Sequence, residues 1–243
     1  MCFKTAVPLE NDLNGYFKKQ TISQGKVFEI RPYPQYYHAD GFDMPQLPVT
    51  TIEEPRIVQP AMWKLIPSWV KTTDEARRYA NTLNATCEEI FEKPSYKNYI
   101  GSYRALLWVS GFFESQHVGK KINPYFIYAA DGDPFTMGCV YSNWLNNDTG
   151  EVLKTFSIIT TPANKLMAEI HNVKRRMPLI IPDCERDRWV SDLKIEGIKE
   201  MMKPISDGFL KAHRVGNLIY QKGVDTNKPE AQKLFIEPVQ TLF

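Results

Sequence analysis

The sequence predicts an α+β fold built on coiled antiparallel β-sheets. Strand-like apolar segments are concentrated in the middle of the chain and follow one another at hairpin-like spacing. Helical segments are short, and strands and helices occur in a mixed order rather than in the repeating order of a parallel α/β sheet. The expected strands are residues 27–30, 105–113, 124–130, 136–141, 155–160 and 178–181.

Short helices are expected around these strands. Residues 72–80 are typical of a helix with Thr72 or Thr73 as its N-cap and acidic residues in its first turn. Asn164 is expected to cap another helix, which ends near His171. The remaining expected helices are residues 96–103, 186–193 and 195–202.

The first 60 residues are rich in proline, which lacks the N–H that a helix interior requires. We therefore expect short strands and loops in this part of the chain and no long helix. The prolines that support this expectation are Pro32, Pro34, Pro45, Pro48, Pro55 and Pro60.

The composition is that of a globular protein. Hydrophobic residues make up 43% and charged residues 24% of the sequence, and we expect residues 1–243 to form a single domain. The net charge is only +2, so a nucleic-acid site would have to be a local basic patch. Taken singly, short basic clusters are usually solvated surface. They occur at residues 18–19, 77–78, 120–121 and 174–176.

The chain shows no secretory signal and no apolar run of the roughly 20 residues that span a bilayer. Its four cysteines and four histidines are scattered, without the spacing of a metal or redox site. We therefore expect a cytoplasmic protein that binds no metal ion, no other cofactor and no membrane. We also expect it to be a monomer. The cysteines are Cys2, Cys87, Cys139 and Cys184.

Cys2 is the first candidate for chemistry. Removal of the initiator methionine would leave an α-amine, with a pKa of about 7.7–8.0, beside a thiol with a pKa of about 8.5. The amine can attack an aldehyde to give an imine, and the thiol can then close a five-membered thiazolidine ring. The simpler interpretation is that a cysteine at position 2 has no special role.

Three further polar residues lie at the ends of apolar segments or within short motifs. Glu114 closes the apolar run at residues 105–113, where a buried carboxylate often has a raised pKa and can exchange protons. His171 could act as a general base, and Asn84 could orient a substrate or an amine. The simpler interpretations are a solvated glutamate, a histidine that caps a helix and a turn asparagine.

Trp63 and Trp69 lie in the segment MWKLIPSW. They are more often core aromatics than functional residues, but they could form a platform for the unstacked bases of a single strand. Residue chemistry alone therefore predicts an intracellular α+β domain without a specific function.

Together these residues resemble the SRAP family (SOS response-associated peptidase), whose members shield abasic sites by covalent attachment. The resemblance implies a barrel-like core with peripheral helices, single-stranded DNA with abasic sites as the partner, and no metal. The matching blocks run in one order along most of the chain: Met1-Cys2, WKLIPSW (63–69), NATCEE (84–89), KPS (93–95), SGFFE (110–114), PYFIYAADG (124–132), TTPAN (160–164), IH (170–171), MP (177–178) and RVGN (214–217).

The resemblance also implies roles for the matched residues. Cys2 would be the nucleophile that forms a thiazolidine with the ring-opened deoxyribose. Asn84 would position the N-terminal amine or the sugar. Glu114 would act as general acid and base in ring opening and imine formation, and in the release of Met1. His171 would assist proton transfer on the sugar oxygen.

DNA contacts are implied as well. Trp63, Trp69 and the neighbouring loop would support a kinked strand whose bases are splayed at the lesion. The family usually begins Met-Cys-Gly-Arg, whereas Phe3 and Lys4 follow Cys2 here. Lys4 keeps a positive charge for DNA binding, and the bulk of Phe3 is expected to reshape the floor of the pocket.

Two other departures concern positive charge. Thr86 stands where the family often has arginine, so an expected phosphate contact is absent. Residues 172–176 separate His171 from Met-Pro, whereas the family usually has two residues there. Our hypothesis is that Arg175 or Arg176 supplies the missing cation.

Two other functions stay open at this point. One is a thiol peptidase that uses Cys2 with His171 and whose main activity is the removal of its own Met1. The other is a non-catalytic module that binds single-stranded DNA. Cross-linking itself requires removal of Met1, because the amide nitrogen of an unprocessed Cys2 cannot form an imine.

Overall fold

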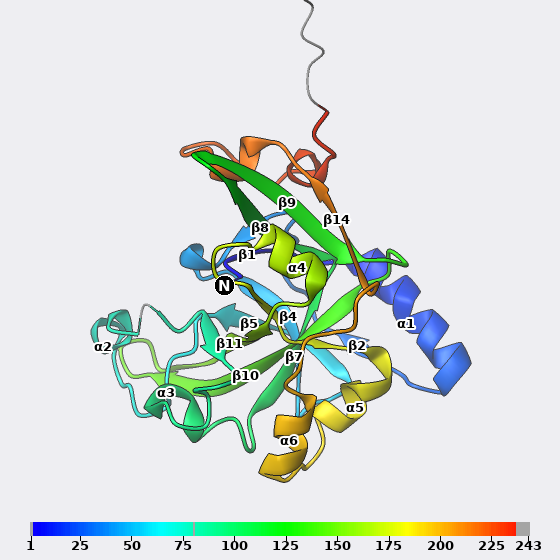
Figure 1. Cartoon of the computed structure of the whole chain (residues 1–243). Helices are drawn as coiled ribbons and strands as arrows, with labels where there is room; N and C mark the ends of the chain where they lie inside the picture. Colours follow the sequence, from blue (N-terminus) through cyan, green and yellow to red (C-terminus); the bar gives the residue numbers. More distant parts are fainter. Residues whose placement is uncertain (1, 80, 237–243) are drawn as a thin grey trace, which may run out of the picture.

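The computed structural model describes residues 2–79 and 81–236, which form two β-sheets flanked by helices (Figure 1). The smaller sheet has five strands and lies above the larger one in this view. In spatial order its strands are β14 (Leu210–Arg214), β9 (Lys121–Ala129), β8 (Gly111–Val118), β1 (Lys4–Ala6) and β3 (Ala39–Asp40).

The larger sheet contains a closed barrel. Antiparallel pairs join each strand of the barrel to its neighbour. The parallel pairs Thr155–Met62 and Phe156–Trp63 join the last strand to the first and close the ring. The ring consists of β11 (Glu151–Pro162), β10 (Phe135–Asn146), β7 (Arg104–Val109), β4 (Gln46–Thr51) and β5 (Ile57–Trp63). Since a closed ring leaves few free edges, the barrel is a stable scaffold, and the predicted α+β fold with a barrel-like core is confirmed.

The remaining strands extend this sheet. They are β2 (Glu29–Ile30), β6 (Asn84–Thr86), β12 (Arg176–Pro178) and β13 (Ile180–Ile181). The strands expected at residues 124–130, 136–141 and 155–160 overlap β9, β10 and β11, each of which is longer than predicted; β9 ends one residue earlier than expected. The strand expected at residues 27–30 shortens to β2, and the one at 178–181 is divided between β12 and β13.

The apolar run at residues 105–113 forms two strands rather than one, and it changes sheets between them. At the change, Ser110 donates its backbone N–H to a carbonyl of β1 at 3.0 Å. Gly111 then approaches β9 so closely that a Cβ would lie 2.6 Å from the carbonyl oxygen of Ile127. This crossing carries Glu114 away from the barrel and into the smaller sheet, beside β1.

The expectation of no long helix in the first 60 residues is wrong. α1 (Glu10–Gln24) lies between Pro8 and Pro32 and contains no proline, so nothing in its own sequence interrupts the helix. Its packing on the core stabilises it, since aromatic side chains of the helix contact Trp108. Three side chains at helical spacing are buried: Leu13, Tyr16 and Phe17.

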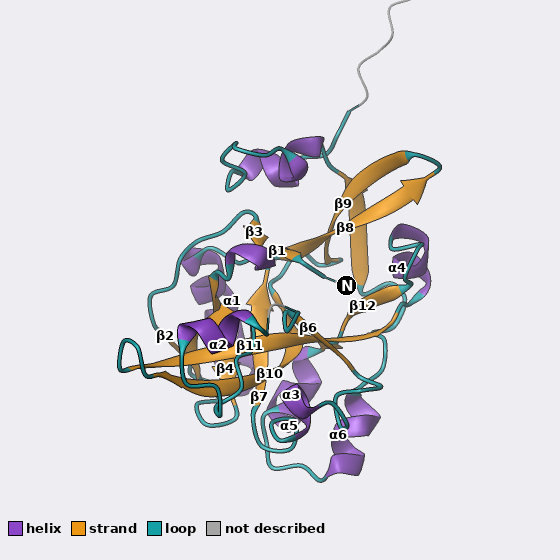
Figure 2. Ribbon diagram, turned by 90° about the vertical axis from the view of Figure 1, so that its left-hand side faces the viewer, coloured by secondary structure: helices purple, strands orange, loops and turns teal. Residues whose placement is uncertain are grey.

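The other α-helices are short and surround the sheets (Figure 2). They are α2 (Thr73–Arg77), α3 (Pro94–Lys97), α4 (Lys165–Ile170), α5 (Arg186–Trp189) and α6 (Ile195–Met201). Two predicted caps are confirmed, because the side chains of Thr72 and Asn164 accept backbone N–H bonds from Glu75 and Met167. Among the described residues, no helix is long and apolar enough to cross a membrane.

Candidate active site

Cys2 lies in the hydrophobic core just before the first strand. β1 is inserted between β3 and β8 and pairs antiparallel with both, which draws the residues before it into the protein. None of the surface of Cys2 is exposed, and its Sγ lies 3.6 Å from the carbonyl oxygen of Lys4. In Figure 1 the start of β1 lies close to α4, between the smaller sheet and the barrel.

Asn84 holds the backbone of Cys2. The Nδ2 atom of Asn84 donates a hydrogen bond to the carbonyl oxygen of Cys2 at 2.8 Å. Asn84 is itself fixed at the start of β6, which pairs in parallel with β11, and its carbonyl accepts a 3.2 Å bond from the hydroxyl of Tyr96. Asn84 is therefore a buried clamp on the backbone of Cys2 rather than a turn residue.

Glu114 and His171 meet beside Cys2. Lys4 pairs with Phe113 in the β1–β8 ladder, so Glu114 follows at the level of the residues that precede Lys4. His171 ends α4, and its Nε2 lies 3.9 Å from Oε2 of Glu114. Both residues are only 8% exposed, so they are functional-site candidates rather than solvated surface groups.

The imidazole of His171 is oriented by the backbone. Its Nδ1 lies 2.8 Å from the carbonyl oxygen of Arg176, which can only accept a hydrogen bond, so Nδ1 carries the proton. In the neutral ring, Nε2 is then the basic nitrogen, and it faces Glu114. This arrangement suits a group that accepts a proton from the site.

Burial sets the protonation of these three side chains. It raises the pKa of the Cys2 thiol, and the charge of Glu114 raises it further, so the thiol is protonated at neutral pH. Burial raises the pKa of Glu114 to about 7, and burial lowers the pKa of His171. The site thus holds a neutral thiol, a neutral imidazole and a carboxyl group that exchanges its proton near neutral pH.

The three predicted cationic residues differ in their surroundings. Lys4 forms an ion pair with Asp40 at the edge of the site. Arg176 is held by both carboxylate oxygens of Glu88, at 2.6 and 2.9 Å, and its hydrogen bonds lower the pKa of Glu88. Arg175 is exposed to solvent, with φ +49°, between His171 and β12. Of the two arginines, Arg175 is therefore the one whose charge is open to solvent and so accessible to a phosphate.

The two predicted tryptophans have separate locations. Trp63 is fully buried, and its Nε1 donates a 2.9 Å bond to the carbonyl of Leu83. Its expected role as a base platform is therefore wrong, because the end of β5 turns its ring into the core. Trp69 is 43% exposed and stacks on Tyr99, with ring centroids 6.0 Å apart, so it can still contact a strand.

Sequence reasoning missed several residues at the site. The hydroxyl of Tyr220 bonds to that of Ser115, which follows Glu114, although 105 residues separate the pair. Glu88 lies in the NATCEE motif, but the sequence does not indicate its pairing with Arg176. Such contacts depend on the tertiary fold and leave no local pattern in the sequence. Their only signal was that Tyr220 follows the block at residues 214–217 and Glu88 lies in the block at 84–89.

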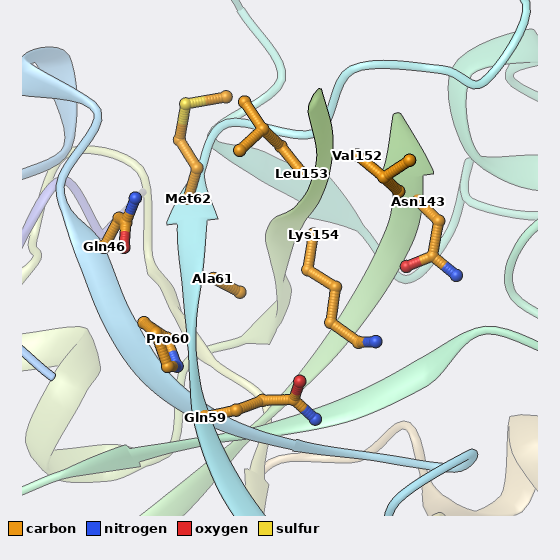
Figure 3. A pocket seen from close by; sticks show the side chains of 9 residues that line it. All are labelled: Gln46, Gln59, Pro60, Ala61, Met62, Asn143, Val152, Leu153 and Lys154. Atoms are coloured by element: carbon orange, nitrogen blue, oxygen red, sulfur yellow. The ribbon is translucent and has the colours of Figure 1, made fainter. Parts of the chain in front are cut away.

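One hollow of the molecule is lined by Trp69 and Tyr99, and another lies apart from the candidate residues. Figure 3 shows the second one, between β5 and β11, with a volume of about 260 Å³ and the side chain of Lys154 directed along it. It is located where these two strands separate before the Thr155–Met62 pair, because Pro60 has no N–H to continue the ladder. Within residues 2–79 and 81–236, no three His, Cys, Asp or Glu side chains are grouped to hold a metal ion.

Known proteins are similar to this chain in sequence. The protein YoqW of Bacillus subtilis, named as an abasic site processing protein, is 30% identical over 171 residues, which cover 69% of this chain and 72% of that protein. The abasic site processing protein HMCES of Pongo abelii is 30% identical over 168 residues, 58% of this chain and 47% of that longer protein.

Solved structures agree with the sequence matches. A crystal structure of a protein from Bacteroides thetaiotaomicron superimposes with a TM-score of 0.84 at 30% identity, covering 97% of this chain and 100% of that one. One from Bordetella bronchiseptica has a TM-score of 0.74 at 17% identity and covers 88% and 100%, which supports the fold alone. Residues 1–222 match the family described as SOS response associated peptidase (SRAP), and the chain belongs to this family.

Proposed function

We propose that this protein processes abasic sites in single-stranded DNA by forming a covalent cross-link through Cys2. Support comes from the family membership and from relatives that are named abasic site processing proteins. The observation that carries the proposal is the convergence of four side chains from four separate parts of the chain on one buried site. They are Cys2, Asn84, Glu114 and His171.

The proposed chemistry needs two nucleophiles on one residue. The α-amine of a processed Cys2 adds to the aldehyde carbon of the ring-opened deoxyribose, and loss of water gives an imine. The thiol then adds across the C=N bond: sulfur bonds to carbon, and the nitrogen receives a proton. The product is a five-membered thiazolidine, and the overall reaction releases one water molecule.

The protonation of the site favours attack by the amine first. Burial keeps the thiol of Cys2 protonated, and only a thiolate is strongly nucleophilic. The thiol therefore reacts in the second step, when ring closure is intramolecular and the effective concentration is high. Glu114, with a pKa of about 7, can donate a proton to the departing hydroxyl and later accept the proton of the thiol.

The other two side chains have supporting roles in the proposal. Asn84 fixes the carbonyl of Cys2 and so restricts where the α-amine can lie. His171 presents a basic Nε2 to the site and exchanges a proton with the sugar oxygen as the ring opens. Arg175 and Lys4 are proposed to bind phosphates, with Trp69 as a stacking surface farther along the strand.

Removal of Met1 is a necessary first step of the proposed reaction. Met1 lies outside the described residues. We include in the proposal that the site releases Met1 itself: the thiol of Cys2 attacks the carbonyl carbon of Met1, Glu114 protonates the amine that leaves, and water hydrolyses the resulting thioester to free methionine and the thiol. We also propose that the protein acts in the cytoplasm, as a monomer in which residues 1–243 form a single domain.

A general thiol peptidase is a weaker candidate for this site. Such an enzyme needs a thiolate paired with an imidazolium. Here burial raises the pKa of Cys2 and lowers the pKa of His171, and both shifts oppose that ion pair. The proposed peptidase activity is therefore limited to the chain's own first residue.

A denaturing gel tests the proposed function. Purified protein is mixed with a single-stranded oligonucleotide that carries one abasic site, beside an undamaged oligonucleotide and the Cys2→Ala variant. A heat-stable shifted band is expected only for the wild type with the abasic strand. A band that persists in Cys2→Ala, or its absence once mass spectrometry shows that Met1 has gone, contradicts the proposal.

A further inference from the structure

Exposed aromatic side chains lie beside Cys2 and Glu114. Phe42 is 65% exposed and Tyr220 is 42% exposed, whereas most large apolar side chains of the chain are buried. Phe42 lies in a 3-10 helix, η1 (Gly41–Asp43), and Tyr220 ends another, η3 (Asn217–Tyr220). Exposed apolar groups gathered at one place usually mark a binding surface.

The structure fixes the position of Phe42. Its backbone N–H is bound at 3.0 Å by the side chain of Asp40, which caps η1. The neighbouring Gly41 donates its N–H to the carbonyl of Phe3 at 2.8 Å. The ring of Phe42 also contacts that of Phe3, with centroids 5.2 Å apart. Phe42 is thus attached directly to the segment that follows Cys2.

Tyr220 is fixed from the other side of the site. Its hydroxyl bonds to the hydroxyl of Ser115, the residue that follows Glu114 in β8, so the two residues are anchored to the same part of that strand. Burial of the hydroxyl raises the pKa of Tyr220, and the charge of Glu114 adds to the effect, which is consistent with this proximity. The hydroxyl is anchored, whereas part of the ring is open to solvent.

Lys4 is connected to both aromatic residues, to Tyr220 directly and to Phe42 through Asp40. Its Nζ pairs with Asp40, the cap of the helix that carries Phe42, and is 6.0 Å from the centroid of the Tyr220 ring. A cation linked to two aromatic residues fits a nucleotide strand, because a phosphate can approach the cation while bases stack on the rings. A hydrophobic peptide would leave the ammonium group without a matching charge other than Asp40.

We propose that Phe42 and Tyr220 form an aromatic rim that stacks the two bases next to the missing one. The proposal rests on the proposed function and names a subsite of it. A strand that lacks one base leaves each neighbouring base without a stacking partner on one side. Phe42 takes the place of that partner for one neighbour and Tyr220 for the other, so the sugar between them is directed towards Cys2.

The test measures binding without cross-linking. The probe is a fluorescent single-stranded oligonucleotide with one tetrahydrofuran residue, an abasic analogue that has no aldehyde. Two further probes lack the base on the 5′ or the 3′ side of this residue. Anisotropy gives the Kd of each probe for the wild type, Phe42→Ala, Tyr220→Ala and Tyr220→Phe. Thermal melts confirm that each variant is folded.

A matched control uses another exposed apolar residue. Val152 is 66% exposed and lines the hollow in Figure 3. It lies about 26 Å along β11 from Thr160, which contacts Arg176 near the site, at a rise of roughly 3.3 Å per residue. Val152→Ala is expected to bind every probe as the wild type does.

The expected result is a coupling between one ring and one base. Each alanine variant should bind the probe with a single tetrahydrofuran residue about tenfold more weakly than the wild type does. The base that stacks on the deleted ring can then be removed from the probe without a further loss of affinity. Tyr220→Phe should keep its affinity, because the ring remains. The aromatic rim would be overturned if the alanine variants bound with the affinity of the wild type. It would also be overturned if the loss of affinity from a variant simply added to the loss from removing a base.

Failure of the rim and failure of the proposed function give different results. If the rim is wrong, the wild type still prefers the abasic probe to an intact strand, but the variants do not change that preference. If the proposed function is wrong, the wild type itself binds no single strand or shows no preference, and this outcome overturns the rim as well.

Discussion

The Oε2 atom of Glu114 and the Nε2 atom of His171 lie 3.9 Å apart, and both residues are almost shielded from water. This pair comes from β8 in the smaller sheet and from the end of α4, so the arrangement of two elements far apart in the sequence creates it. Its environment holds the pKa of Glu114 near 7. A carboxyl group poised in this way can serve both proton-transfer steps of the proposed reaction.

Glu114→Gln should change how stability depends on pH. Because burial raises the pKa of Glu114 from 4.5 to about 7, the folded protein binds a proton in that window that the unfolded chain releases. The free energy of unfolding therefore falls as pH rises from about 4.5 to 7. Relative to wild type, the variant should gain roughly 1–3 kcal/mol between pH 4 and pH 8.

Urea unfolding at the two pH values measures this difference, with the exposed Glu196→Gln as the control. An equal effect of Glu114→Gln at pH 4 and pH 8 would show that Glu114 ionises as an ordinary carboxyl group.

Cys2→Ala should separate the two covalent steps. Because Cys2 is proposed to release Met1, the variant is prepared with the substituted alanine as its first residue, and mass spectrometry checks that Met1 is absent. Its α-amine can then form the imine, but without a thiol it cannot close the thiazolidine ring. We expect no heat-stable band on its own and a clear band when cyanoborohydride reduces the imine during the reaction. If reduction traps nothing in the variant, the thiol rather than the amine makes the first bond.

Asn84→Ala should weaken both the fold and the reaction. It removes the 2.8 Å hydrogen bond to the carbonyl of Cys2 and leaves that buried oxygen without this donor, at a cost of about 1–3 kcal/mol in the free energy of unfolding. Without the clamp the amine is no longer oriented, and cross-linking should slow by roughly 100-fold. Single-turnover gels provide the rate, and the exposed Asn98→Ala should match the wild type.

Arg175 and Arg176 should differ in their salt dependence. Arg175 is exposed, so Arg175→Ala should reduce the slope of log K against log salt by about 0.7, the value for one phosphate of a single strand. Arg176 is already paired with Glu88, and Arg176→Ala should change the slope less. Arg77→Ala, at a site with 77% side-chain exposure, is the control. Equal slopes for Arg175→Ala and the wild type would exclude the phosphate contact.

Much of the fold was predictable from the sequence because apolar periodicity and caps act locally. Thr72 and Asn164 cap helices as expected, and the central strands occur where alternating apolar residues predicted them. α1 was not predicted because the first 60 residues are rich in proline. A proline excludes a helix only around its own position, and the residues of α1 include none. The sheet change at Ser110 was missed because an uninterrupted apolar run does not show where a chain turns.

The candidate site was predictable in part, and for a different reason. Matched motifs identified Cys2, Asn84 and Glu114 as candidates, and the structure brings them together. The motif also suggested Trp63, whose ring is in the core, since a motif can mark packing as well as function. Tyr220 has no signal in the sequence beyond its position after the block at residues 214–217, because its contact with Ser115 forms only in the tertiary fold.

Intact mass spectrometry of the cross-linked product tests the central claim most directly. The protein is incubated with an abasic single-stranded oligonucleotide, and the adduct is measured and then digested to locate the attachment. The account predicts a mass equal to the protein without Met1 plus the oligonucleotide minus one water, with the modification on Cys2. An adduct that retains Met1, or one attached to another residue, would contradict it.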